Sequence, residues 1–285
     1  MPELPEVQAL VADLGSRLHG RIVDRLEVLS FAALKTYEPL ATALHGMTVN
    51  SVTRHGKFLD LGIGELHLVM HLARAGWIRW REGAPNRTRP GAGPMAARLV
   101  LDDGSGFDVT EAGTKKSLAI FIVRNPIDVP RIATLGPDPL EPGFTVDAFA
   151  AILAAAGRSQ IKGVLRNQAI IAGIGNAYSD EILHEARMSP YKPAHMPREE
   201  VERLFDAMQH TVRSAVARAD GLSASELKKE KKTNLQVHGR TGEACPVCGD
   251  TIRQVIFADS TLQYCPTCQT GGRPLADRVL SRLLK

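Results

Sequence analysis

The sequence predicts an α+β multidomain protein with an N-terminal β domain, a C-terminal helical domain and a closing zinc-bound hairpin. Short β-type runs separated by glycine-rich turns occupy residues 21–129. Helical periodicity follows the proline-rich segment Gly136–Pro142. The four cysteines stand near the end of the chain in two C-x2-C pairs. We therefore divide the chain into residues 1–131, a hinge at 132–143, a helical domain at 144–240 and a zinc module at 241–285.

An amphipathic helix is expected near the start of the chain. Apolar residues recur there every three or four positions, at Val7, Leu10, Val11, Leu14 and Leu18. This spacing places them on one face of a helix, so we expect a helix at Glu6–Leu18.

The β domain consists of short apolar runs. We expect strands at Ile22–Val28, Thr48–Arg54, Lys57–Leu61, Leu66–Leu72, Trp77–Trp80, Arg98–Leu101, Gly106–Thr110 and Leu118–Val123. Strands of this length are typical of an antiparallel sandwich or barrel. One of Trp77 and Trp80 should face the core. His55, His67 and His71 show no metal-ligand spacing, so we interpret them as structural or hydrogen-bonding residues.

The second half of the chain is predicted to be helical. Helices are expected at Val146–Ala156, Ile161–Leu165, Ala177–Glu185 and Glu199–Ala219. Two biased segments, Gly83–Pro94 and the lysine-rich run Lys228–Lys232, are interpreted as solvated loops. The lysine run would add a nonspecific attraction for phosphate that weakens with salt.

Composition permits a nucleic-acid partner without requiring one. The chain has 285 residues, a formal net charge of +4 and a pI near 8.9. We find no signal peptide and no apolar run long enough to span a membrane, so we expect a cytoplasmic protein.

The cysteine pattern predicts one structural Zn²⁺. The ligands would be the chain's only cysteines, Cys245, Cys248, Cys265 and Cys268. Four thiolates close a tetrahedral site and leave no open position for catalysis. The alternative of two disulfides needs an oxidising compartment, which the cytoplasmic expectation argues against. Ile252–Phe257 and Thr261–Tyr264 between the pairs are expected to form a β-hairpin.

The N-terminal sequence Met1-Pro-Glu-Leu-Pro-Glu6 indicates a nucleophile. Proline at position 2 favours removal of Met1, which leaves Pro2 with a secondary amine. Such an amine can attack an aldehyde-like sugar carbon and form an iminium. Glu3 and Glu6 follow within one helical turn. The alternative reading is an ordinary helix start, with proline in the first turn and acids that complement the helix dipole.

A glycine-lined turn precedes one predicted helix. Gly173 and Gly175 permit tight backbone geometry before a helix that begins near Asn176 or Ala177. Backbone N–H groups at such a helix start suit a phosphate, and Asn176 adds a side-chain donor. A simple packing corner between two helices explains the same residues, and the turn alone leaves both readings open.

Three stretches together resemble one family. The PELPE start, the AGIGNAYSDEIL turn and the CPVC…CPTCQ hairpin occur in the order found in formamidopyrimidine-DNA glycosylases and endonuclease VIII. The resemblance spans the chain. It implies a two-layer β-sandwich with flanking helices, then a helix–two-turn–helix DNA-binding domain ending in a zinc finger. Damaged DNA would bind between the two domains of a monomer.

The resemblance implies roles for individual residues. Pro2 would attack C1′ of the damaged nucleotide, Glu3 would protonate the sugar ring oxygen and Glu6 would support them. Lys57 matches a lysine that contacts the phosphate beside the lesion. The damaged base must leave the stack to be reached, and the iminium then permits elimination of the phosphates.

Further phosphate contacts are implied for the C-terminal half. Asn176 matches the asparagine of the helix–two-turn–helix turn, and Lys162 matches a phosphate-binding lysine. Gly239-Arg240 matches a Gly-Arg pair of the family, so Arg240 is a further DNA-binding candidate.

The chain departs from the family at the residues that fill the space of the flipped base. Arg74 stands where a methionine is usual. The loop at 111–118, which contains Lys115, lacks the usual phenylalanine. The zinc-hairpin tip carries Asp259 in place of an arginine, so Arg253, Arg273 or Lys115 would have to substitute. We therefore expect Arg74 and Lys115 to contact DNA, with single-stranded, forked or crosslinked DNA favoured.

Three classes of function fit these patterns. The first is a bifunctional DNA glycosylase and abasic-site lyase that uses Pro2. The second is a DNA-damage-binding protein with weak or no strand cleavage, which the missing hairpin arginine keeps open. The third is a zinc-ribbon interaction protein without DNA chemistry, which the N-terminal motif argues against.

Overall fold

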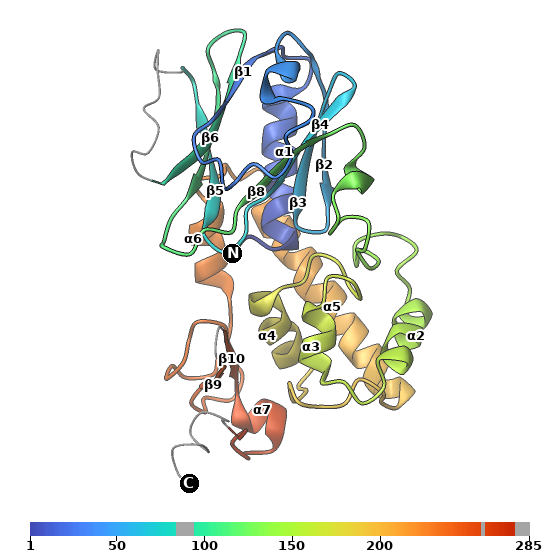
Figure 1. Cartoon of the computed structure of the whole chain (residues 1–285). Helices are drawn as coiled ribbons and strands as arrows, with labels where there is room; N and C mark the ends of the chain where they lie inside the picture. The colour runs from blue at the N-terminus through green and yellow to red at the C-terminus, as the bar shows by residue number, and fades with distance from the viewer. Residues whose placement is uncertain (84–93, 258–259, 277–285) are drawn as a thin grey trace. The chain divides into compact units, whose positions relative to one another are not determined.

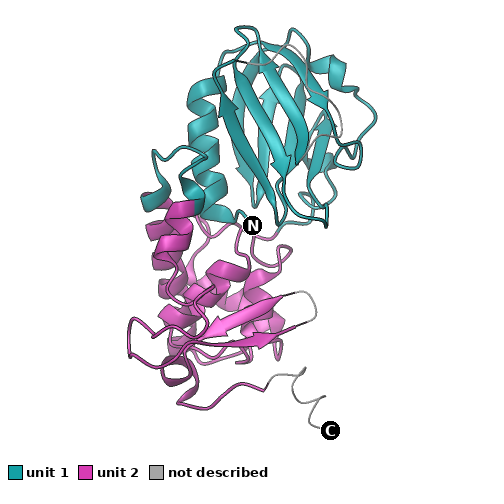
Figure 2. Ribbon diagram, turned by 90° about the vertical axis from the view of Figure 1, so that its left-hand side faces the viewer, with its two compact units in different colours: residues 1–135, 218–228 teal, residues 136–217, 229–285 magenta. Residues whose placement is uncertain are grey.

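The computed structural model describes residues 1–83, 94–257 and 260–276. The chain divides into two compact units (Figure 2). The N-terminal unit comprises residues 1–135 and 218–228, and the C-terminal unit comprises residues 136–217 and 229–285. The first division, after Leu135, falls within the proposed hinge segment. The return of residues 218–228 to the N-terminal unit has no counterpart in the sequence analysis.

Two antiparallel four-stranded sheets build the N-terminal unit (Figure 1). One sheet has the order β1-β6-β7-β5, with bounds Val23–Val28, Met95–Leu101, Gly106–Glu111 and Gly76–Arg81. The other has the order β2-β3-β4-β8, with bounds Val49–His55, Phe58–Ile63, Leu66–His71 and Ala119–Val123. Two separate sheets make a sandwich, so the barrel alternative is excluded.

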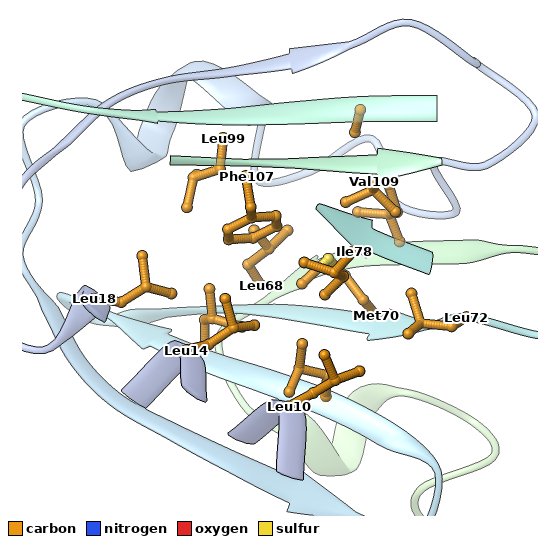
Figure 3. Packing of buried hydrophobic residues seen from close by; sticks show 14 of the residues in the cluster. Leu10, Leu14, Leu18, Leu68, Met70, Leu72, Ile78, Leu99, Phe107 and Val109 are labelled. Carbon is orange, nitrogen blue, oxygen red and sulfur yellow. The ribbon is translucent and has the colours of Figure 1, made fainter. Parts of the chain in front are cut away.

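Helix α1, Leu4–Leu18, supplies apolar side chains to the core of this unit. Leu10, Leu14 and Leu18 are fully buried, and Figure 3 shows them facing side chains of the sheets. Phe107 of β7 lies in the same cluster. Each such side chain stabilises the fold by about 1.5–3 kcal/mol relative to exposure. The predicted helix is therefore confirmed, and it begins two residues earlier than expected.

Strand β3 carries one buried carboxylate among its apolar residues. Asp60 is 2% exposed and accepts hydrogen bonds from His55 Nε2 at 3.0 Å and His67 Nδ1 at 2.9 Å. Two neighbouring strands thus supply the donors that a buried carboxylate requires. The hydrogen-bonding interpretation of these two histidines is confirmed.

One expectation about the core also holds. Trp77 is 6% exposed, and its indole N–H donates to the Ala224 carbonyl at 2.7 Å. Trp80 is half-buried. Ala219, Ala224 and Leu227 join the buried cluster of the N-terminal unit. Their packing gives the physical reason why residues 218–228 belong to that unit.

The C-terminal unit is helical before its zinc module. Its helices are α2 Val146–Ala156, α3 Ile161–Arg166, α4 Asn176–Glu185 and α5 Arg198–Ala219, of which the last two residues lie in the N-terminal unit. The module contains β9 Arg253–Ile256, β10 Thr261–Tyr264 and α7 Pro266–Thr270. Strands β9 and β10 pair antiparallel, as the hairpin prediction requires.

The interpretation of Lys228–Lys232 as a solvated loop is wrong. These residues form most of helix α6, Leu227–Asn234. Leu227 is fully buried and anchors the first turn. The Lys231 ammonium lies 4.6 Å from the ring centroid of Tyr178, a contact that offsets part of the repulsion among the lysines. The other biased segment, Gly83–Pro94, lies mostly outside the described residues.

Among the residues that the structure describes, no helix combines the length and the apolar character needed to cross a bilayer.

Candidate active site and zinc centre

The start of α1 holds the predicted catalytic residues in a reciprocal capping arrangement. The Glu3 backbone N–H donates to Glu6 Oε2 at 2.8 Å, and the Glu3 carboxylate accepts the backbone N–H of Glu6. Pro2 is buried, and Glu3 and Glu6 are each 2% exposed. The reading as a helix start is therefore confirmed, and the reading as a nucleophile stays a prediction. The helix cap fixes the peptide that joins Pro2 to Glu3.

Lys57 lies in the two-residue turn between β2 and β3. Gly56 adopts a φ of 56°, which lets the strands reverse direction. The Arg54 guanidinium donates to the Gly56 carbonyl at 2.9 Å and to Gln8 Oε1 at 3.1 Å. Because Gln8 belongs to α1, Arg54 ties the lysine turn to the helix that begins with Glu3.

His71 at the end of β4 lies in an electropositive setting. Burial, together with the charges of Lys57 and Arg131, lowers the pKa of His71 from 6.5 to about 4. Its ring packs on Phe58 with centroids 4.7 Å apart. A neutral histidine beside two cations leaves the local charge positive, which suits a bound phosphate.

Arg74 and Lys115 lie in exposed segments of the N-terminal unit. Arg74 follows Ala73, whose φ of 52° is rare for a residue other than glycine. The loop that contains Lys115 is held at its end by Glu111, whose Oε1 accepts the backbone N–H groups of Ser117 at 2.6 Å and Leu118 at 2.9 Å. Both cations can therefore reach a ligand from solvent.

The turn between α3 and α4 is organised by one side chain. The Gln168 amide donates to the Arg166 and Ile174 carbonyls, at 2.9 and 2.7 Å, and accepts the Gly173 N–H at 3.0 Å. Gly173 has a φ of 86°, so a β-carbon there would be strained. The glycine turn is thus a preformed structure before α4.

Asn176 and Lys162 are joined to the interior of the C-terminal unit. Asn176 Nδ2 donates to the Thr261 carbonyl of β10 at 2.7 Å. Lys162 is 5% exposed and pairs with Asp180, with a further hydrogen bond to Ser179 Oγ at 2.9 Å. Their phosphate contacts stay predictions, since these polar groups already bond within the protein.

Helix α4 also holds the segment that leads into the zinc module. Glu181 is 6% exposed, and its carboxylate accepts the backbone N–H groups of Gln236, Val237 and His238 at 2.6–3.0 Å. Burial raises the pKa of Glu181, and these three donors oppose that change. Asp180 Oδ2 accepts from His238 Nδ1 at 2.7 Å. The buried acids of α4 therefore fix residues 236–238.

The four cysteines form the site of one structural Zn²⁺. All four are free thiols, and their sulfur atoms lie within 4.8 Å of one another. The Cys245–Cys268 and Cys248–Cys265 sulfur pairs are 3.9 and 3.3 Å apart. An ideal zinc tetrathiolate has edges of about 3.8 Å, given Zn–S bonds of about 2.3 Å. The donor set and its spacing therefore fit zinc.

His184 of α4 supports one ligand from outside the tetrahedron. Its Nε2 lies 3.3 Å from Cys245 Sγ. An N–H directed at a thiolate stabilises the charged ligand. Helix α4 therefore contacts the metal site as well as the segment before it.

The other DNA contacts predicted for the zinc module stay predictions. Arg240 donates to the Thr233 carbonyl at 3.0 Å and lies 3.6 Å from Glu243, so its DNA contact stays a prediction. Arg253 and Arg273 are exposed. The expectation about Asp259 at the hairpin tip lies outside the described residues.

Several residues of the site escape sequence reasoning. The Glu3-x-x-Glu6 spacing is a signal for the capping box, which the sequence analysis did not predict. Arg54, Gln8 and His71 gave no signal because their partners lie on distant segments. Asp180 and Glu181 did carry a signal. Two adjacent acids directly before the apolar pair Ile182 and Leu183 are costly to bury unless they bind specific donors.

Three domain families match the chain in order. They are the formamidopyrimidine-DNA glycosylase N-terminal domain at residues 1–114, the formamidopyrimidine-DNA glycosylase H2TH domain at 135–226 and the zinc finger found in FPG and IleRS at 242–271. The fold and the site thus define a zinc-finger protein that joins a β-sandwich to a helix–two-turn–helix domain.

Two relatives match this chain, one of them over nearly its whole length. A formamidopyrimidine-DNA glycosylase of Symbiobacterium thermophilum is 35% identical over 94% of this chain and 89% of its own. An uncharacterized formamidopyrimidine-DNA glycosylase-like protein of Mycobacterium tuberculosis is 52% identical over 55% of this chain and 98% of its own. This chain belongs to the formamidopyrimidine-DNA glycosylase family.

Solved structures agree with this assignment. The formamidopyrimidine-DNA glycosylase of Lactococcus lactis, bound noncovalently to DNA with an abasic site, superposes with a TM-score of 0.82 at 26% identity and covers 94% of this chain and 99% of its own. The Thermus thermophilus protein superposes with a TM-score of 0.79 at 30% identity, over 96% and 100% of the two chains.

Proposed function

We propose that this protein is a DNA glycosylase with abasic-site lyase activity that uses the amine of Pro2. The observation that carries the proposal is the capped helix start, where buried Pro2 precedes two buried carboxylates. Membership of the glycosylase family supports it, as does the abasic-site DNA bound by the Lactococcus lactis relative.

The proposed reaction requires removal of Met1, which converts the Pro2 amide into a secondary amine. The amine nitrogen attacks C1′, the bond from C1′ to the base breaks, and the base leaves with the proton that the amine loses. Glu3 donates a proton to the sugar ring oxygen, which opens the ring and yields an iminium at C1′. Loss of a C2′ proton then expels the 3′ phosphate.

The residues around Pro2 and Glu3 have separate roles in this proposal. Glu6 is a positioning residue, because its carboxylate binds the backbone N–H of Glu3. Lys57 binds a phosphate of the damaged strand within the positive setting of His71. Arg74, Lys115, Lys162, Asn176 and Arg240 are further proposed DNA contacts.

The setting of this chemistry is also proposed. The protein acts as a monomer on damaged DNA in the bacterial cytoplasm. Its two units each bring DNA-binding candidates, with Lys57, Arg74 and Lys115 in the N-terminal unit.

A second candidate function is damage binding with weak or no strand cleavage. The hairpin tip of the sequence carries Asp259, whose charge repels a phosphate, and Arg74 replaces an apolar wedge. These departures affect residues that would bind DNA. The capped Pro2-Glu3 start, by contrast, holds the residues that would break the bond between the sugar and the base. The geometry therefore favours the enzyme.

Borohydride trapping on abasic DNA distinguishes the two functions. Protein shown by intact mass to begin at Pro2 should form a reducible covalent adduct, because only an iminium is reduced by borohydride to a stable bond between protein and DNA. A version with Met1 retained is the matched control and should form none. The absence of an adduct from the processed protein would overturn the enzyme proposal.

Glu3→Gln separates the two chemical steps. This variant should lose about 10²–10⁴-fold in base excision, which is the usual contribution of a general acid, yet retain trapping on DNA that is already abasic. Single-turnover excision and trapping are measured side by side. Equal loss of both activities would contradict the assigned role.

A further inference from the structure

A cavity of about 460 Å³ lies on the N-terminal unit, away from the start of α1. Its walls come from α1, β5 and residues 223–228, and they include Arg17, Trp77, Arg79, Trp80 and Lys228. This volume falls within the usual range of about 300–1,000 Å³ for small-molecule sites. We call it the tryptophan pocket. The first residue of α1 that lines the pocket is Asp13. It lies ten residues after Glu3, which corresponds to about 15 Å along the helix axis.

Flat surfaces that favour planar ligands line the tryptophan pocket. Trp80 is half-buried, and the Arg17 guanidinium lies 4.9 Å from its ring centroid. Arg17 is held there by Asp13 at 2.7 Å. Indole rings and guanidinium planes both stack on nucleobases.

Two further cations, Arg79 and Lys228, line the same pocket. The Lys228 ammonium lies 4.5 Å from the Trp77 ring centroid. Burial lowers the pKa of Lys228, and the charge of Arg79 lowers it further. Within the described residues, no carboxylate forms an ion pair with Arg79 or Lys228. Two cations that line one pocket and pair with no carboxylate repel each other, and a bound anion would relieve this repulsion.

We propose that the tryptophan pocket binds a nucleoside phosphate, with the base against Trp80 and Arg17 and the phosphate between Arg79 and Lys228. The ligand is either a free nucleotide or one nucleotide of a single DNA strand. The two sources share this chemistry. The proposal does not depend on the reactivity of Pro2, because no residue of the pocket takes part in the glycosylase step.

The chain offers a direct reporter for this site. Trp77 and Trp80 are its only two tryptophans, and both line the pocket. Intrinsic fluorescence of the full-length protein therefore follows occupancy. Thymidine 5′-monophosphate should change the emission saturably and should bind at least about tenfold more tightly than thymidine or inorganic phosphate, since each lacks one of the two contacts.

Single substitutions test the assigned cations. Arg79→Ala and Lys228→Ala should each weaken nucleotide binding about tenfold, and Lys228→Arg should restore most of it. Lys229→Ala removes the same charge from the neighbouring exposed position and is the matched control. Borohydride trapping of all variants should match that of the original protein, which separates this proposal from the glycosylase.

A tetranucleotide of thymidine identifies the source of the ligand. Tighter binding than the mononucleotide indicates a DNA strand, and equal or weaker binding indicates a free nucleotide; either result supports the pocket. Three outcomes overturn it. They are a fluorescence change that does not saturate, equal affinity for inorganic phosphate, or the same weakening by Lys229→Ala as by Lys228→Ala.

Discussion

Glu6 shows how one residue serves both folding and the proposed chemistry. Its carboxylate accepts the Glu3 backbone N–H and so satisfies a donor that the helix start would otherwise leave without a partner. A cap of this kind contributes about 1 kcal/mol to stability. The same hydrogen bond fixes the peptide next to Pro2. A helix cap is therefore what orients the proposed nucleophile.

His71 has a pH dependence that can be measured. Its pKa of about 4 in the folded protein lies below the 6.5 of an unperturbed histidine. Between these values the unfolded state binds more protons, so the free energy of unfolding should rise with pH through this window. The contribution is about 3 kcal/mol, fully present above pH 6.5 and lost as the pH falls to 4.

Chemical denaturation at several pH values checks this prediction. His71→Phe keeps a ring beside Phe58 and should remove most of the change between pH 4 and 6.5. His19→Gln, at an exposed histidine, should leave it unchanged. Identical pH profiles for His71→Phe and the original protein would contradict the assignment.

At the level of elements, helix α4 organises the C-terminal unit. Asn176, Asp180, Glu181 and His184 contact β10, residues 236–238 and Cys245. These contacts join the helix that follows the glycine turn to the zinc module. A change in the position of helix α4 should therefore alter the conformation of the zinc module, and the reverse.

Glu181→Ala tests this link. The substitution leaves three backbone N–H groups without their acceptor, and we expect a loss of about 3 kcal/mol in the free energy of unfolding. Hydrogen exchange at residues 236–238 should accelerate. Glu185→Ala, at an exposed acid of the same helix, is the control and should change stability little. Slow exchange at 236–238 in Glu181→Ala would argue against the link.

Removal of zinc should affect only one unit. Elemental analysis of reduced protein should find one zinc per chain, and chelation should loosen the β9–β10 hairpin and weaken DNA binding. Trp77 and Trp80 both lie in the N-terminal unit, so their emission should stay native after chelation. Protein that contains no zinc, or a native hairpin after complete removal, would contradict this.

At the scale of the whole molecule, the proposed substrate follows from Arg74 and Lys115. These residues stand where the resemblance implies a side chain that fills the space of the flipped base. Arg74 and Lys115 are exposed cations, and neither fills a stacked duplex as an apolar side chain does. Unpairing and unstacking a base in a duplex costs a few kcal/mol. Single-stranded or forked DNA needs little of this energy, because its bases are already unpaired. We expect excision on single-stranded or forked substrates to equal or exceed that on matched duplex.

Single-turnover kinetics with one lesion in each context, at fixed salt, measure this preference. A strong preference for intact duplex that depends on the opposite base would show that other residues act as the wedge. Arg74→Ala then decides whether arginine does so, because a loss confined to duplex DNA would identify it. An equal loss in every context would indicate a phosphate contact instead.

Much of the fold was predictable because it depends on the spacing of residues that are close together in the sequence. The apolar spacing of Leu10, Leu14 and Leu18 is itself the condition for a helix that buries one face. The two C-x2-C pairs bring their ligands together through short turns, so the zinc site follows from spacing. The Lys228–Lys232 segment was misjudged because Leu227 just before it anchors the helix.

The sequence by itself determined most of the helices and strands, though not α6, together with the zinc ligands and the Pro2-Glu3-Glu6 start, since each depends on residues close together in the chain. Only the tertiary structure decided between sandwich and barrel, because strand order depends on pairings between distant segments. It alone returned residues 218–228 to the N-terminal unit and gave Lys162 a buried partner in Asp180. Those outcomes rest on packing and on the need to pair buried charges, which no local pattern encodes.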